Sequence, residues 1–174
     1  HFIAFCALIA ASAALMLSPR TGGAYAGGVI YAATVLLMFG LSALYHRPMW
    51  SLRTRRVLRR LDHSGIFFLI VGSVTAFWTL APPTARSPVQ LGAMWLAALA
   101  GVAAMVLWTD MPRALRAGAY VALGLAATPL VLKLPAILGW GHAGWVLGAA
   151  AIYVLGAIVY ARRWPNPDPR VFGY

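Results

Sequence analysis

The residues of this sequence that could do chemistry lie in three short stretches. Ser42 and His46 are four residues apart, so a helix would stack both side chains on one face. Asp62 and His63 open the third apolar stretch, and His1 opens the first. If neighbouring helices run antiparallel, Asp62 lies at a depth close to that of His46. A histidine beside a carboxylate can bind a metal ion or transfer a proton, and the pattern predicts one of these two chemistries.

Each of these residues also has a structural interpretation. Asp62 could cap the amino terminus of a helix, and His46 could be an interfacial histidine without a ligand. Ser42 could bond back to its own helix, and His63 would point to a different helical face from Asp62. A catalytic zinc site needs three protein ligands and a water, so His46, with or without His1, is incomplete. Charge and periodicity leave these alternatives open.

The composition excludes a water-soluble globular domain. Of 174 residues, 62% are apolar, 10% are charged and only three are acidic. The net charge of +11 does not indicate a nucleic-acid partner, because Lys and Arg are absent from six long apolar stretches. The single cysteine, Cys6, excludes a disulfide within the chain. His1 is not a start methionine and follows no basic region, so we expect a segment of a longer chain rather than a secretory precursor.

The six apolar stretches predict six transmembrane helices. A helix needs about 20 residues to cross a hydrocarbon core about 30 Å thick. None of the stretches alternates with a period of two, as barrel strands do, and only helices then satisfy the backbone in lipid. The predicted fold class is an all-α polytopic membrane bundle, with 1–174 as one transmembrane domain. The predicted helices are 2–17, 24–45, 64–81, 87–109, 117–132 and 143–161.

The placement of the arginines predicts the orientation. Six lie between the second and third helices, two between the fourth and fifth, and three after the sixth, against three cations in the alternate connections. Because cytoplasmic loops collect Lys and Arg, the first helix should start in the cytoplasm, in the plasma (inner) membrane. The candidate residues then lie on the cytoplasmic side. The largest cluster could also bind anionic membrane lipid; its members are Arg47, Arg53, Arg55, Arg56, Arg59 and Arg60.

Three segments resemble one known family. They are Ser-Ala-Leu-Tyr-His at 42–46, Arg-Leu-Asp-His-Ser-Gly-Ile at 60–66 and Trp-Pro-Asn-Pro-Asp-Pro-Arg-Val-Phe-Gly-Tyr at 164–174. Together they resemble the haemolysin III family, the bacterial branch of the seven-helix progestin and adiponectin receptor proteins, over nearly the whole chain. In that family a Glu-x-x-Asn-x-x-Thr-His motif opens the first helix, and His1 resembles its last residue. A seventh helix with a His-x-x-x-His pair is expected directly after Tyr174, so the chain is truncated at both ends relative to the family.

The resemblance implies a zinc site. His46 matches the ligand that the second helix contributes to a three-histidine site, and the other two histidines are expected beyond the end of this chain. Asp62 matches the aspartate near the zinc-bound water, and Ser42 matches the serine one turn before the ligand. These two are the implied catalytic residues, and His1 and His63 would lie just outside the ligands. Zinc is therefore expected in the complete protein and should be weakly bound or absent in this chain.

The implied reaction is hydrolysis of a lipid amide. Zinc would lower the pKa of its water to about 7, and Asp62 would orient that water or accept its proton before it attacks a carbonyl. Related receptors and alkaline ceramidases suggest a ceramide-like substrate. The family name suggests pore formation or cytolysis instead, but no polar stripe continues through any predicted span. In a third possibility the protein is a noncatalytic membrane sensor, and zinc only clamps its helices.

Overall fold

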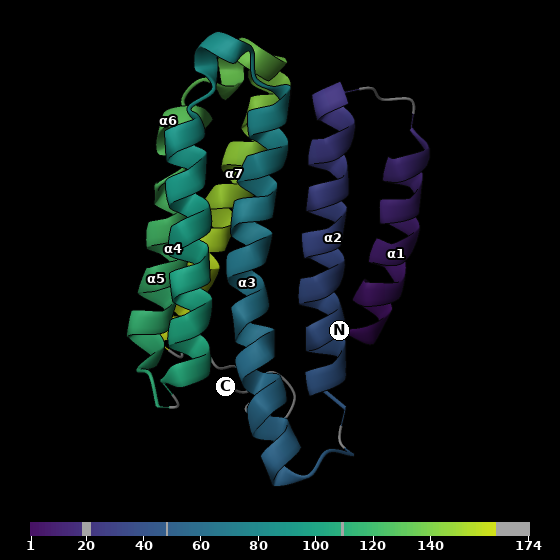
Figure 1. The fold of residues 1–174 in the computed structure, drawn as a ribbon, viewed down its shortest axis with the longest axis vertical. Helices are drawn as coiled ribbons and strands as arrows, with labels where there is room; N and C mark the ends of the chain where they lie inside the picture. The colour runs from purple at the N-terminus through teal and green to yellow at the C-terminus, as the bar shows by residue number, and fades with distance from the viewer. Residues whose placement is uncertain (19–21, 48, 109, 163–174) are drawn as a thin grey trace. The chain divides into compact units, whose positions relative to one another are not determined.

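Helices build both compact units of this chain. The computed structural model describes residues 1–18, 22–47, 49–108 and 110–162. No strand occurs among the described residues, and the predicted all-α class is confirmed. One compact unit is His1–Thr109 and the other is Asp110–Tyr174. The motif at 164–174 lies outside the described residues. The elements are α1 (Phe2–Leu17), α2 (Gly22–Tyr45), α3 (Leu52–Leu80), η1 (Pro83–Ala85), α4 (Pro88–Leu107), α5 (Arg113–Leu125), α6 (Thr128–Val131) and α7 (Leu134–Arg162) (Figure 1).

Among the described residues, four helices are long and apolar enough to cross a membrane. They are α2, α3, α4 and α7, and the apolar α1 is shorter, at 16 residues. The chain is therefore a multi-pass membrane bundle, as predicted. The prediction that 1–174 is one transmembrane domain stays a prediction.

The predicted fifth helix, 117–132, is wrong as one continuous helix. A turn at Ala126 and Ala127 separates α5 from α6. Pro129 has no N–H to donate to the carbonyl of Leu125, so the helical hydrogen-bond ladder cannot pass through it. The Thr128 hydroxyl donates to that carbonyl instead. The break follows from one missing backbone donor in an otherwise apolar stretch.

The predicted start of the third helix, at 64, is also wrong. Helix α3 begins at Leu52, where the Ser51 hydroxyl accepts a hydrogen bond from the backbone N–H of Thr54 at 3.2 Å. Hydropathy marks only the part of a helix that lies in lipid, and the arginine-rich turns before it are helical as well. Asp62 therefore lies inside α3, and its alternative role as a helix cap is excluded.

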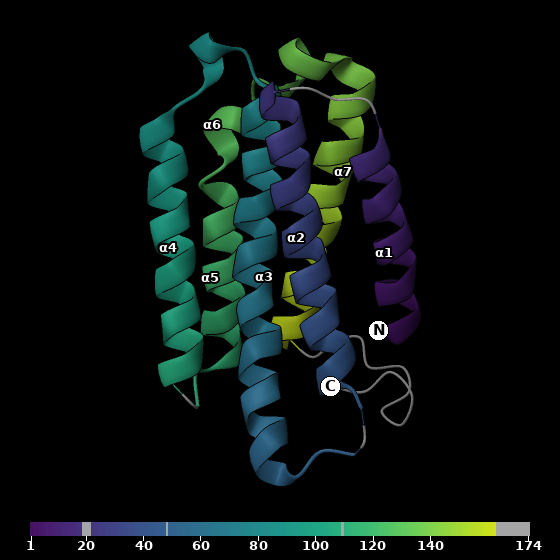
Figure 2. The ribbon, with the colours of Figure 1, turned by 45° about the vertical axis from the view of Figure 1, so that its right-hand side comes forward.

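In the unit His1–Thr109, α3 lies between α2 and α4, and α1 lies beside α2 (Figures 1 and 2). Small residues let these helices approach closely. A Cβ atom added to Gly72 of α3 would overlap the side chain of Thr34 on α2, and one added to Gly101 of α4 would overlap the ring of Phe67. Phe67 is 2% exposed. Such close packing stabilises helix association in lipid, where burial of apolar surface contributes little to the free energy of association.

We expect Gly72→Ala to lower the stability of the bundle by about 1–3 kcal/mol, because the added methyl group overpacks the contact with Thr34. The matched control is Gly92→Ala in α4, where a Cβ atom would meet nothing within 4 Å and alanine favours the helix. The check is thermal unfolding of both variants in the same detergent. Equal midpoints for the two variants would show that the close α2–α3 contact is not required.

In the unit Asp110–Tyr174, α5 contacts α7. The guanidinium of Arg116, near the start of α5, donates to the Tyr160 hydroxyl, near the end of α7, at 3.3 Å. It also donates to the carbonyl of Met111 at 3.1 Å. Helix α7 is kinked at Gly139, whose φ of 78° is a conformation that glycine adopts without strain. The predicted sixth helix, 143–161, lies after this kink.

Candidate functional site

A chain of polar contacts joins three helices at one end of the unit His1–Thr109. The Ser42 hydroxyl, in the last turn of α2, lies 2.9 Å from Nδ1 of His1, which precedes α1. The same hydroxyl hydrogen-bonds to the side chain of Asp62 in α3. An ionised carboxylate only accepts, so Ser42 then donates to Asp62 and accepts from the Nδ1–H of His1. Ser42 is 4% exposed, and Asp62 is 15% exposed at its side chain.

His46 joins this chain by stacking on His1. The ring centroids are 3.9 Å apart and the planes differ by 3°. The backbone N–H of His46 donates to the carbonyl of Ser42 at 3.1 Å, which continues the helical pattern past the last residue of α2. His46 is also near enough to Asp62 to interact with its charge. The predicted neighbours Ser42, His46, Asp62 and His1 therefore meet.

His63 lies beside these residues and bonds within α3. Its Nδ1 is 2.7 Å from the carbonyl of Arg59, one turn earlier, and 3.8 Å from Oδ2 of Asp62. The imidazole thus contributes to the charge environment of Asp62 while it points along its own helix. His63 thus contacts both the Asp62 carboxylate and the backbone of its own helix.

The donor types at this end fit zinc, but their arrangement does not complete a zinc site. Zinc takes imidazole nitrogens and carboxylate oxygens, which His46 and Asp62 could supply. The lone pairs of an imidazole lie in its plane, so the parallel rings of His1 and His46 do not direct their nitrogens to one ion. Among the residues that the structure describes, no group of three or more His, Cys, Asp or Glu side chains could hold a metal ion. The roles of His46 as ligand and of Asp62 and Ser42 as catalytic residues stay predictions.

Sequence reasoning missed two contacts around these residues. Tyr45 lies edge-on to His46, with ring centroids 4.9 Å apart. Arg60 donates from Nη1 to the carbonyl of Val106 at 3.2 Å, which ties α3 to the end of α4. The adjacency of Tyr45 to His46 was a visible signal for the first contact. The second depends on how α3 and α4 are aligned, and nothing in the local sequence indicates it.

Comparisons with known proteins agree with the resemblance that the motifs predicted. The profile of the family described as Haemolysin-III related matches residues 1–174. The adiponectin receptor protein of Drosophila melanogaster is 26% identical over 144 residues, which cover 75% of this chain and 32% of the receptor. The chain thus spans about a third of the length of this curated relative. No solved structure matches the chain. Because the family match extends over all of its residues, this chain belongs to the haemolysin III-related family of integral membrane proteins, which the progestin and adiponectin receptor proteins resemble.

Proposed function

We propose that this chain is part of a zinc-dependent membrane hydrolase that acts on a lipid amide. The observation that carries the proposal is the meeting of His1, Ser42, His46 and Asp62 where the start of α1 and the last turn of α2 lie beside α3. Ionisable groups on membrane helices are costly, so the gathering of two histidines around a partly buried aspartate favours a functional site over a structural one. The family match supports the same assignment.

The contacts give each residue a role. His46 would supply one imidazole to zinc, and the metal would supply the Lewis acidity that activates water towards a carbonyl. Asp62 is a partly buried carboxylate close to His46, and it would accept a proton from the attacking water and return it to the amine nitrogen as the C–N bond breaks. The Ser42 hydroxyl would fix the orientation of that carboxylate, and the Nδ1–H of His1 would fix the orientation of Ser42.

A long-chain amide is the substrate class that this setting favours. The helices around the cluster present large apolar side chains outward, among them Phe2 at 56% exposure and Leu44 at 43%. In a membrane those side chains contact acyl chains, so an amide with a long chain reaches the cluster from within the bilayer. A ceramide has an amide at the depth where its chains meet its headgroup, which matches a site at helix ends.

We further propose that this end of the helices faces the cytoplasm of a cell whose plasma (inner) membrane holds the protein. In the unit His1–Thr109 the arginine-rich connection between α2 and α3 lies at the end that holds His1, and the connection between α3 and α4, which contains Arg86, lies at the other end (Figure 1). In the unit Asp110–Tyr174, Arg116 near the start of α5 and Arg162 at the end of α7 share one end. Each unit thus has one cationic end, and the rule that cytoplasmic loops are rich in Arg orients both.

The test is hydrolysis of ceramide by the full-length native protein in liposomes. We expect fatty acid to be released when zinc is present, to stop when a chelator removes the metal, and to resume when zinc is returned. Liposomes without protein give the background rate. If zinc-loaded protein releases fatty acid no faster than this background, the proposed reaction is wrong, although the family assignment stands.

A further inference from the structure

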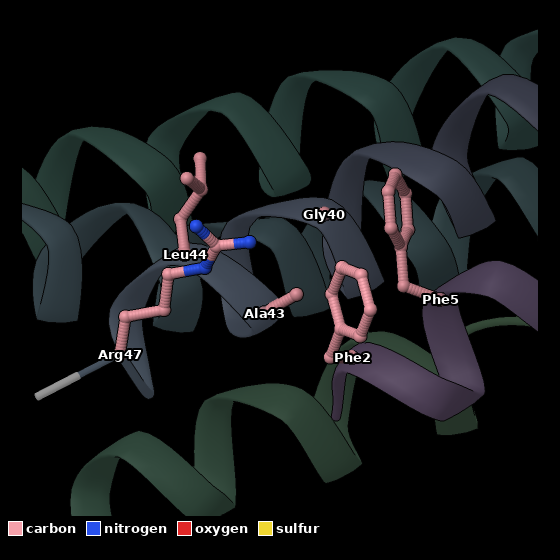
Figure 3. Close-up of a pocket in the computed structure, with 6 residues that line it drawn as sticks. All are labelled: Phe2, Phe5, Gly40, Ala43, Leu44 and Arg47. Atoms are coloured by element: carbon pink, nitrogen blue, oxygen red, sulfur yellow. The ribbon is translucent and has the colours of Figure 1, made fainter.

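A pocket of about 240 Å³ lies between the start of α1 and the end of α2 (Figure 3). Five of its six lining residues are apolar and the sixth is an arginine. None of the four cluster residues lines it, so the pocket adjoins the proposed hydrolytic cluster without containing it. The lining residues are Phe2, Phe5, Gly40, Ala43, Leu44 and Arg47.

A glycine and two aromatic rings shape this pocket. Figure 3 shows the rings of Phe2 and Phe5 side by side on α1, facing Gly40 and Ala43 of α2. A Cβ atom on Gly40 would lie 3.2 Å from the ring of Phe5, so even the smallest side chain would narrow the space. The guanidinium of Arg47 lies over the ring of Phe2, 5.7 Å from its centroid. The pocket thus has apolar walls and one cation at its edge.

The position of the pocket places its edge at the headgroup layer. Arg47 follows the end of α2, and Trp50 donates from its indole N–H to the carbonyl of Leu44 at 2.6 Å. Tryptophan prefers the level of the headgroups, and arginine directs its charge to the same level. The apolar walls formed by Phe5 and Gly40 lie further along the helices, on the side of the acyl chains.

We propose that this pocket binds one anionic phospholipid, with part of an acyl chain between α1 and α2 and the phosphate on Arg47. A volume of 240 Å³ is below the range of about 300–1,000 Å³ for whole small molecules, so the pocket takes a segment of a larger one. Apolar walls favour a hydrocarbon segment, and the planar guanidinium favours a phosphate. An anionic phospholipid carries both groups, whereas a ceramide lacks the phosphate.

The bound lipid would also reach the proposed hydrolytic cluster through neighbours in the sequence. Phe2 follows His1, and Arg47 follows His46. A lipid held by these two lining residues would fasten the start of α1 to the end of α2, and so keep His1 stacked on His46. Lipid binding itself does not depend on zinc or on hydrolysis, so the two proposals fail separately.

The test measures lipids bound to the full-length native protein by mass spectrometry of the intact complex, in the presence of a zinc chelator. The probes are phosphatidylglycerol and phosphatidylcholine with the same acyl chains. We expect the first lipid bound to be phosphatidylglycerol, and Arg47→Gln to weaken its binding by about fivefold, the effect of one arginine near an anionic lipid surface, ~1 kcal/mol. Ala43→Leu should fill the pocket and weaken the binding of both lipids.

The matched control is Arg53→Gln, which removes the same charge from an exposed position outside the pocket. It should leave the affinity for phosphatidylglycerol within twofold of that of the parent. Equal losses for the Arg47 and Arg53 variants would overturn the proposal, because they would indicate attraction by the arginine cluster as a whole. A parent protein that does not distinguish the two lipids would overturn it as well. Arg47 is exposed, so its variant tests binding without disturbing the core.

Discussion

Asp62→Asn is expected to slow zinc-dependent ceramide hydrolysis by the full-length protein by about 10²–10⁴-fold, the usual contribution of a general base. Asparagine has nearly the same shape and can still accept the hydrogen bond from Ser42, but its amide cannot take a proton at neutral pH. The folded arrangement should therefore survive while proton transfer is lost. The measurement is the initial rate of fatty acid release at saturating zinc.

The control for this variant is Asp110→Asn, which removes the same charge at an exposed position in the other compact unit. Its rate should equal that of the parent. The zinc content of both variants should be measured together with the rates. A variant that is slow because it has lost zinc can then be distinguished from one that is slow because it has lost the general base. An Asp62 variant that binds zinc and hydrolyses ceramide at the parental rate would leave Asp62 without a catalytic role.

His46→Ala is expected to weaken zinc binding by the full-length protein by more than about 100-fold. Replacing a residue that only supports a metal ligand lowers metal affinity by about 10–100-fold, and replacing the ligand itself should lower it further. The measurement is competition for zinc with a chromophoric chelator of known affinity. It reads the metal directly, so its result does not depend on whether ceramide is the substrate.

The matched control for His46 is His142→Ala. The His142 ring is exposed, and its Nδ1 lies 3.2 Å from the carbonyl of Leu138 in its own helix. Its replacement should leave the zinc affinity unchanged. If the His46 variant instead binds zinc as tightly as the parent does, His46 is an interfacial histidine and the proposed zinc site must be built from other residues.

The fold was largely predictable because a chain that crosses lipid must do so as long apolar helices. Apolar stretches located the helices, but hydropathy does not report where backbone hydrogen bonds begin or end. The start of α3 at Leu52 depends on the cap at Ser51, which precedes a polar segment. The break between α5 and α6 depends on Pro129, a single residue in a stretch of suitable hydropathy. Both errors arose at helix boundaries, which are set by backbone hydrogen bonding and not by the hydropathy of the side chains.

The candidate site was predictable in part. The spacing of Ser42 and His46 indicated one helical face, and the place of Asp62 in the sequence indicated its depth. The stacking of His1 on His46 was not predictable, because it depends on how α1 is tilted and shifted against α2. Helical periodicity describes one helix at a time, so it gives no information on how two helices are positioned against each other.

The early start of α3 has a mechanical consequence. Asp62 lies ten positions after Leu52, and the segment between them is one uninterrupted helix about 15 Å long at the helical rise per residue. A loop in this place would absorb a push or a twist, whereas a helix transmits both as a stiff rod. The arginine-rich turns and the Asp62 carboxylate therefore move as one rigid segment. A ligand that binds to the first turns of α3 and rotates them would also rotate Asp62 relative to Ser42.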